Sequence, residues 1–306
     1  MTPCGVLVLD KAAGVTSFDA VAVVRRQLGI RRVGHAGTLD PQATGVLPVL
    51  LGEATKLMPY LADQDKEYVA TVRFGVVTDT HDLAGRVVAT APVPALTRAR
   101  LEAACRPFVG RIRQVPPMYS AVHHEGRRLY ELAREGVEVE RAPREVVVHS
   151  LTVESLGEQS ASLRIVCGKG TYVRVLAADL GAALGCGAAL ESLVRTRVGP
   201  FALAGAVGWA TLAAETHERL RARVLPPEAA LAGWADVRLD AERERRFRHG
   251  QAIDVARMAV PDATLVRVHE ASGALLGVGE VQASGSRVRP VRMLNADRSG
   301  TRLLPA

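Results

Sequence analysis

Several features are scarce in this chain of 306 residues, and their scarcity excludes some classes of protein. Aromatic residues make up only 4%, so Val, Leu, Ile and Ala must fill the core. Cysteine occurs four times, and no two cysteines form a CxxC pair, which argues against a zinc ribbon and a thioredoxin motif. Scattered cysteines are typical of reduced, mostly buried thiols, and they predict a cytoplasmic protein.

Long hydrophobic runs are also missing. No uncharged apolar stretch reaches roughly 18 residues, so we expect no membrane span. The N-terminal segment MTPCGVLVLDKAAG has a short apolar run followed by charge, which is not the pattern of a signal peptide. Hydrophobic residues (48%) and charged residues (23%) occur at ordinary globular levels, and the length fits one large domain or two smaller ones.

Lysine is rare, with four residues against 35 arginines, although the net charge is +7 and the isoelectric point is near 9.6. Arginine makes the bidentate contacts that phosphates favour, but a GC-rich genome also enriches Arg, Ala and Gly. Under either explanation the positive charge favours a polyanionic partner.

The N-terminal part predicts a strand over 5–9 and a helix that follows it. Ser17 is the expected N-cap and Gly29 the expected stop of this helix. Four arginines in eight residues come next, at 25, 26, 31 and 32. The apolar face of the helix is expected to contain Phe18, Val21, Val24 and Leu28.

Further along, apolar residues alternate with polar ones over 68–74 and again over 163–167, which predicts two strands. Thr171 is the expected cap of a helix that ends at Gly185. Strands and helices mix without a regular βαβ alternation, so we expect an α+β fold. The apolar face of the second helix is expected to contain Val173, Leu176, Ala177, Leu180 and Leu184.

The last 76 residues differ from the rest, with 12 basic and 9 acidic residues. The segment 225–232 reads as a linker, and the runs 265–268 and 275–281, joined by a turn at 271–273, predict strands. We therefore expect a catalytic domain over 1–232 and a small all-β module over 233–306. Its basic surface is expected to include Arg287, Arg289, Arg292, Arg298 and Arg302.

Three short motifs fail on inspection. The run 168–171 (GKGT) lacks the first glycine of a phosphate-binding P-loop, and 277–279 (GVG) lacks the third glycine of a dinucleotide fingerprint. The run 123–125 (HHE) has no PCxxC partner, as a zinc deaminase requires. The histidines also lack metal-ligand spacing, so no metal site and no cofactor is predicted.

The segment 34–57 is the densest in glycine and proline, and Asp40 lies at its centre between Leu39 and Pro41. A single Asp-Pro is most often turn chemistry. However, residues 34–48 match the motif GHxGxLDPxATGxLP throughout, and by this match the chain resembles the TruB family of pseudouridine synthases. Further family motifs match at 9–17, 66–68, 78–85, 116–121, 128–134, 170–174 and 193–199.

The resemblance implies a pseudouridine-synthase fold: a mixed, largely antiparallel central sheet with helices and loops, and a small C-terminal PUA-like module. It also implies that the uridine at position 55 in the T loop of tRNA becomes pseudouridine. That reaction breaks the N1–C1′ bond and rejoins the base through C5, so it needs no cofactor. Asp40 would be the catalytic aspartate. The sequence leaves open whether it adds to the base, adds to C1′ or removes a proton from C2′.

The same resemblance assigns the other site residues. Arg174 would pair with Asp40 and keep it ionised, and Tyr68 would stack on the target base. Because a base in a folded loop must flip out to react, His35 would fill the vacated space. The substrate-binding positions of the family fall on His35, Tyr172, Leu193, Asp82 and Lys11.

Two positions depart from the family pattern: Ala12 replaces a usual proline, and His123 a frequent lysine. Two alternatives stay open: an RNA-folding module without catalysis, and a carboxylate-dependent hydrolase. The first does not explain Asp40, Tyr68 and Arg174 together, and the second lacks a further carboxylate or a metal cluster. The expected partner is the T arm of tRNA, and no feature demands an oligomer, so we expect a monomer.

Overall fold

The computed structural model describes residues 3–295, and most of them surround one mixed sheet of ten strands. Among these residues the β1–β14 and β3–β12 pairs are parallel and the other pairs of this sheet antiparallel, which confirms the predicted α+β architecture. The main path runs β14 (Val207–Gly208), β1 (Gly5–Lys11), β3 (Thr44–Leu51), β12 (Ala188–Val198), β4 (Lys66–Phe74), β11 (Ser160–Cys167), β10 (Arg144–Leu156) and β7 (Gly110–Gln114), with β2 (Val33–His35) on β3 and β13 (Phe201–Ala202) on β12.

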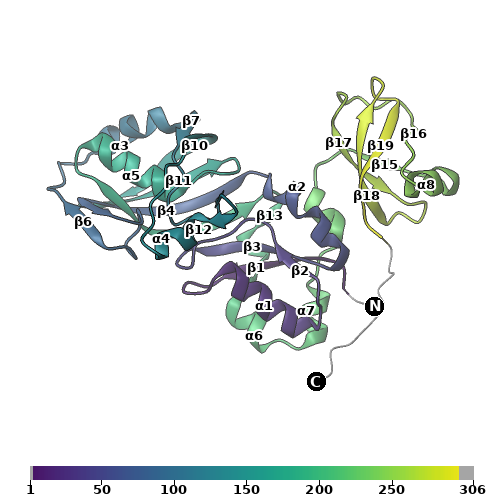
Figure 1. Ribbon diagram of the computed structural model, residues 1–306, viewed down its shortest axis with the longest axis horizontal. Coiled ribbons are helices and arrows are strands. Elements are labelled where there is room, and N and C mark those ends of the chain that lie inside the picture. The colour runs from purple at the N-terminus through teal and green to yellow at the C-terminus, as the bar shows by residue number, and fades with distance from the viewer. Residues whose placement is uncertain (1–2, 296–306) are drawn as a thin grey trace.

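Helices cover the sheet at both of its ends (Figure 1). Those near β1 and those near β10 and β11 share one large core, in which β4 and β11 bury every second residue as their alternation predicted. Two small hairpins, β5 (Val76–Thr78) with β6 (Val87–Thr90) and β8 (His123–His124) with β9 (Arg127–Arg128), project from the sheet. The helices of this body are α1 (Ser17–Leu28), α2 (Met58–Ala62), α3 (Arg98–Cys105), α4 (Leu129–Arg134), α5 (Val173–Leu184), α6 (Trp209–Ala214) and α7 (His217–Ala222).

Helix α1 begins differently from the prediction. Thr16, not Ser17, is the N-cap: its side chain accepts from the Asp19 backbone in a capping box, and Gly29 ends the helix with φ 61°. Phe18 was predicted to face the core but is 70% exposed, because the buried stripe consists of Ala20, Val21, Val24 and Leu28.

The start of helix α5 differs from the prediction in the opposite direction, since its N-cap lies one residue later than predicted. Its N-cap is Tyr172, without a side-chain cap, and the Thr171 hydroxyl instead donates to the Gly168 carbonyl at 3.1 Å. The predicted apolar face is buried, and Gly185 ends the helix with φ 80°. Arg174 is therefore in the first turn, where the helix dipole repels a cation unless an anion lies beside it.

The segment 225–232 is not a loose linker. Leu225 pairs with Val6 of β1, and a 3-10 turn over Pro227–Leu231 buries Ala230 and Leu231 completely or nearly so. After it comes the predicted β module, a five-stranded sheet that also carries the unpredicted helix α8 (Ala241–Arg248). Its strands are β15 (Asp236–Arg238), β17 (Leu265–His269), β18 (Leu275–Gln282), β19 (Arg287–Met293) and β16 (Ile253–Asp254).

This module lies beside the part of the body that holds α2 (Figure 1). Leu275, Val278 and Leu294 of the module belong to a buried cluster that also contains Ala54 and Leu57 of the body. Arg298 and Arg302, two of the predicted basic residues, lie outside the described residues. Within 3–295, no helix is long and apolar enough to cross a membrane.

Candidate active site

Asp40 lies in the loop between β2 and β3, and buried polar groups hold this loop in place. The Ser17 hydroxyl accepts from the Leu39 N–H at 2.9 Å and donates to the Leu39 carbonyl at 3.2 Å. On the other side of Asp40, the Lys11 ammonium donates to the Pro41 carbonyl at 3.0 Å. The backbone on both sides of Asp40 is therefore fixed by side chains from β1 and α1.

Arg174 of α5 binds the Asp40 carboxylate with two hydrogen bonds. Nε donates to Oδ2 at 2.8 Å and Nη2 to Oδ1 at 3.2 Å, while Nη1 and Nη2 also donate to the carbonyls of Thr80 and Tyr119. The Arg174 side chain is 5% exposed but that of Asp40 is 40% exposed. A bidentate guanidinium favours the ionised carboxylate, which remains open to a reactant.

Asp82 also approaches this guanidinium, at the same Nε atom that binds Asp40. Its Oδ2 is 3.8 Å from Arg174 Nε, and its Oδ1 accepts from the Thr80 hydroxyl at 2.6 Å and from the Ala84 N–H at 3.1 Å. Asp82 and Asp40 both line a cavity of about 340 Å³, which Arg174 also lines. A neighbouring cavity shares Asp40 and Arg174 with it.

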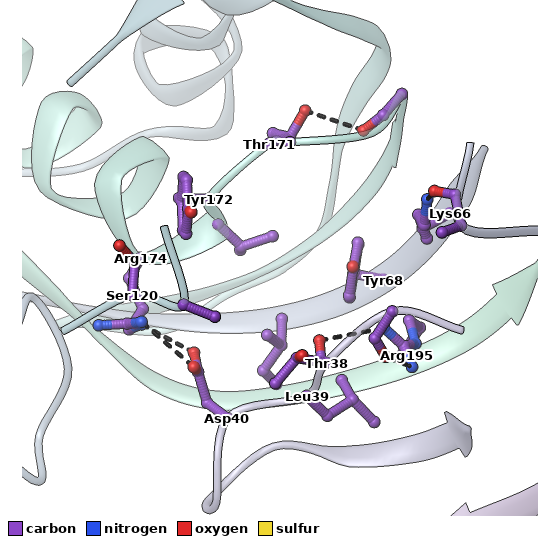
Figure 2. A pocket seen from close by; sticks show the side chains of 17 residues that line it. Thr38, Leu39, Asp40, Lys66, Tyr68, Ser120, Thr171, Tyr172, Arg174 and Arg195 are labelled. Atoms are coloured by element: carbon purple, nitrogen blue, oxygen red, sulfur yellow. Dashed lines mark hydrogen bonds and ion pairs between the residues drawn. The ribbon is translucent and has the colours of Figure 1, made fainter. Parts of the chain in front are cut away.

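The main cavity has a volume of about 270 Å³, near the lower limit of the roughly 300–1,000 Å³ of typical ligand pockets. In Figure 2, Asp40 and Arg174 lie at one end of this cavity, Lys66 and Arg195 lie at the other, and Tyr68 lies between them. The cavity therefore has a carboxylate end and a cationic end. Five of the predicted site residues line it: Asp40, Tyr68, Tyr172, Arg174 and Leu193.

The two tyrosines are held in different ways. Tyr68 is a core-facing residue of β4, and burial raises the pKa of its hydroxyl, so the hydroxyl stays protonated at neutral pH. Tyr172 is fixed by Gln114, whose side-chain amide accepts from the Tyr172 N–H at 2.9 Å and donates to its carbonyl at 3.2 Å.

Lys11 and His35 do not line the cavity. Lys11 is fully buried, donates to the carbonyls of Ala12, Val15 and Pro41, and has its pKa lowered by burial to about 8. His35 has its pKa lowered by burial and by the positive charge of Arg195, so its ring is neutral at pH 7. Its Nδ1 is buried and has no hydrogen-bond partner among residues 3–295.

Sequence reasoning missed three residues of the site. Ser17 was taken as a helix cap, and Lys66 and Arg195 were seen only as parts of the family motifs at 66–68 and 193–199. Lys66 lines the cavity and donates to the Ala62 and Gln64 carbonyls, and burial lowers its pKa to about 8. The signal that could have identified Arg195 is its spacing, because it follows Leu193 by two residues and so shares a strand face with that apolar residue.

Three family models match the chain in succession. TruB family pseudouridylate synthase (N terminal domain) matches residues 25–173, and tRNA pseudouridylate synthase B C-terminal domain matches residues 174–232. Pseudouridine synthase II TruB, C-terminal, matches residues 235–294.

The chain is similar along most of its length to proteins named tRNA pseudouridine synthase B. It is 45% identical to that of Chromohalobacter salexigens over 291 residues (95% of this chain, 94% of the relative). It is 44% identical to that of Ralstonia pickettii over 303 residues, with the same coverage of both chains.

Two solved structures share the fold. One is a chain of an H/ACA ribonucleoprotein bound to a substrate RNA containing 2′-deoxyuridine (TM-score 0.72, 24% identity, 95% of this chain and 85% of that chain). The other is a chain of a Cbf5–Nop10–Gar1 complex (TM-score 0.72, 25% identity, 95% and 84%).

Proposed function

The chain belongs to the TruB family of tRNA pseudouridine synthases, and from this premise we propose that Asp40 is the carboxylate with which it works. The protein is an isomerase that converts a uridine of tRNA into pseudouridine. The reacting base is that of position 55 in the T loop. One observation carries the assignment of Asp40: its carboxylate is bound at both oxygens by Arg174 and still faces the cavity.

The cavity supports a role for each residue that lines it. Asp40 meets the ribose or the base, and the two hydrogen bonds from Arg174 hold its carboxylate in one orientation. Tyr68, Tyr172 and Leu193 enclose the flipped uracil, with Tyr68 against its face. Asp82, whose carboxylate is 3.8 Å from Arg174 Nε, helps to orient Arg174.

Lys11 and His35 act from outside the cavity. Because Lys11 gives its three hydrogen bonds to backbone carbonyls, we propose that it positions the loop of Asp40 and does not touch RNA. The buried, unpartnered Nδ1 of His35 supports a role in filling the space left by the flipped base, where a base edge would satisfy it.

For the whole chain we propose a catalytic domain over 1–232 and an RNA-binding module over 233–306. The separate five-stranded sheet of the module and its own buried cluster support this division. We also propose that the protein acts as a monomer and that it is cytoplasmic; the free, buried thiols of Cys105, Cys167 and Cys186 support the second point, as they fit a reducing compartment.

The test uses an unmodified T-arm stem-loop RNA and maps pseudouridine at single-nucleotide resolution. The wild-type chain should modify the T-loop uridine, and Asp40→Asn should bind the RNA without forming product. Product in the Asp40→Asn reaction would refute the catalytic assignment. If neither protein made product but both remodelled the RNA, the protein would be an RNA-folding module.

A further inference from the structure

Arg195 is a fully buried arginine with an unusual set of partners. Its side chain lines the cavity, and it donates to three backbone carbonyls: Nε to Val46 at 2.8 Å, Nη2 to Gly37 at 2.9 Å and Nη1 to Thr38 at 3.4 Å. A guanidinium has five N–H groups, so one N–H on each of Nη1 and Nη2 remains beyond these bonds. Tyr68 of β4 is the register partner of Arg195 of β12, and both residues line the cavity.

No carboxylate of residues 3–295 forms an ion pair with Arg195, and Asp40 stabilises its charge only from a distance. Among residues 3–295, no carboxylate lies within 4.0 Å of Arg195 or of its neighbour Lys66, while Arg174 is already paired with Asp40. An isolated buried charge is strongly unfavourable. The uracil base is neutral in the ground state, so the base by itself supplies no counterion for Arg195 and Lys66 at this end of the cavity.

Two glycines of the motif that contains Asp40 lie directly against Arg195. A Cβ on Gly45 would meet the Arg195 carbonyl oxygen at 2.3 Å, and a Cβ on Gly37 would meet Arg195 Nη1 at 3.4 Å. Both glycines also have positive φ, 98° and 90°. Gly45 therefore makes room for the backbone of β12 at Arg195, and Gly37 lies against the Arg195 side chain.

The reaction supplies the missing negative charge. When the N1–C1′ bond breaks, its electron pair stays on N1, and the uracil becomes an anion delocalised over N1, its carbonyl oxygens and C5. In this route the Asp40 carboxylate, at the opposite end of the cavity, would face the ribose. The same electron pair then forms the C5–C1′ bond; C5 loses its proton to solvent and N1 gains one, so no oxidant or reductant is needed.

We propose that Arg195 stabilises this uracil anion through its fixed positive charge, together with the Tyr68 hydroxyl, which lines the same cavity. The proposal rests on the pseudouridine synthase function given above. A fixed, water-excluded cation favours the charge that develops in the transition state and does little for the neutral substrate. The carboxylate end of the cavity would thus serve the sugar, and the cationic end the base.

The test compares uridine with 5-fluorouridine at the target position of a T-arm RNA, because fluorine by itself stabilises the uracil anion. Single-turnover consumption of the N-glycosidic nucleoside is followed by nuclease digestion and mass spectrometry for wild type, Arg195→Gln and Arg195→Lys. Arg197→Gln is the matched control, since Arg197 lies on the same strand but is 36% exposed and pairs with Glu67.

We expect Arg195→Gln to slow the uridine reaction about 10²–10³-fold and the 5-fluorouridine reaction about tenfold less. The dissociation constant for RNA should stay within twofold of wild type, about the scatter expected where no charged contact is lost. Arg195→Lys keeps a positive charge but loses the planar guanidinium, so its ratio of uridine slowing to 5-fluorouridine slowing should lie between those of wild type and Arg195→Gln. If Arg195→Gln does not fold, the ratio for Arg195→Lys tests the proposal by itself.

Equal slowing of both nucleosides would overturn the proposal, because a purely structural role affects both alike. Weaker RNA binding with an unchanged rate at saturation would also overturn it and would mark Arg195 as a phosphate contact. Absence of pseudouridine with wild-type protein and the uridine RNA would instead reject the proposed function itself.

Discussion

The pairing of Asp40 with Arg174 depends on the shape of the guanidinium as well as on its charge. Both carboxylate oxygens are engaged, and Arg174 also reaches the carbonyls of Thr80 and Tyr119. A lysine would supply the charge at one point and could not bridge these four acceptors in the same plane.

We therefore expect Arg174→Lys to lower the single-turnover rate about 10²-fold or more while RNA affinity changes little. Quench-flow kinetics at saturating RNA measures the rate, and filter binding measures the affinity. Arg223→Lys is the control, since Arg223 binds Glu215 with the same two-bond geometry on the exposed surface. A rate within threefold of wild type for Arg174→Lys would show that charge alone suffices.

Lys66 gives a prediction about pH. Its pKa of about 8 lies below the ordinary 10.5, so the unfolded chain binds more protons than the folded chain between these values. The stability contribution of Lys66 is therefore complete above pH 10.5 and is lost as the pH falls through 8.

Relative to Lys66→Met, the wild type should gain up to about 3 kcal/mol of unfolding free energy between pH 8 and 10.5. Urea denaturation of both proteins across this range gives the difference, in which the titrations of other groups cancel. A difference that stays constant with pH would show that Lys66 keeps its ordinary pKa in the folded chain.

The sequence identifies residues that act through side-chain identity and misses those that act through tertiary contacts. Asp40 and Arg174 lie 134 positions apart in the sequence. Their pairing could be predicted only from the resemblance to the family motifs. Arg195 occurs within such a motif, yet nothing local reveals that it is buried against the loop of Asp40. Its partners are carbonyl groups, which leave no trace in the pattern of side chains.

At the level of elements, the start of α1 assigns separate tasks to two adjacent hydroxyls. Thr16 caps the helix, while Ser17 is 3% exposed and makes both of its hydrogen bonds with Leu39, the residue before Asp40. One position therefore stabilises the helix and the next connects that helix to the loop.

Thr16→Ala should destabilise the fold by about 1 kcal/mol and leave turnover unchanged. Ser17→Ala leaves a buried N–H and a buried carbonyl of Leu39 without partners, so it should destabilise the fold by about 1–3 kcal/mol and also lower turnover. Thermal denaturation and single-turnover rates of the two variants separate the tasks. Equal turnover in both would mean that Ser17 does not control the position of Asp40.

The existence of the elements could be predicted better than their ends. The periodicity of apolar residues predicted α1, α5, β4 and β11, because buried positions recur at regular intervals along these elements. Both helix starts were misplaced, since Ser17 and Thr171 are good cap residues whose hydroxyls are used elsewhere. Helix α8 was missed because it buries one residue, Phe247, and its charged sequence carries almost no apolar stripe.

At the scale of the whole molecule, the C-terminal module is docked and not merely tethered. Lys56 donates to the Met293 carbonyl at 2.9 Å, and Glu53 accepts from the Asn295 N–H at 2.9 Å, beside the apolar cluster shared by the two parts. The composition of 225–232 suggested a flexible linker, because Pro and Ala are common in linkers. The segment packs against β1, which lies more than two hundred residues earlier, so the sequence of 225–232 alone could not predict this contact.

The docked module presents β19 with three exposed arginines in different electrostatic states. Glu280 binds Arg289 with two hydrogen bonds, at 2.8 and 2.9 Å, whereas Arg287 and Arg292 form no ion pair with any described residue. An arginine already neutralised by a carboxylate has less to offer a phosphate. If the module holds tRNA through its basic surface, Arg287 and Arg292 should contribute most.

Each phosphate contact adds about one to the slope of log affinity against log salt. The double variant Arg287→Gln, Arg292→Gln should therefore bind a T-arm RNA more weakly, with a salt slope smaller by about 2 and an unchanged rate at saturation. Arg289→Gln is the internal control and should change the slope by less than 1, about the share of a single contact. Titrations between 50 and 200 mM salt, the range over which such contacts are measured, give both slopes.

An unchanged slope in the double variant would place the phosphate contacts on the catalytic domain, with the arginines around α1 as the next candidates. The two surfaces are thus distinguished by slope, while the chemistry at Asp40 is read separately from the saturating rate.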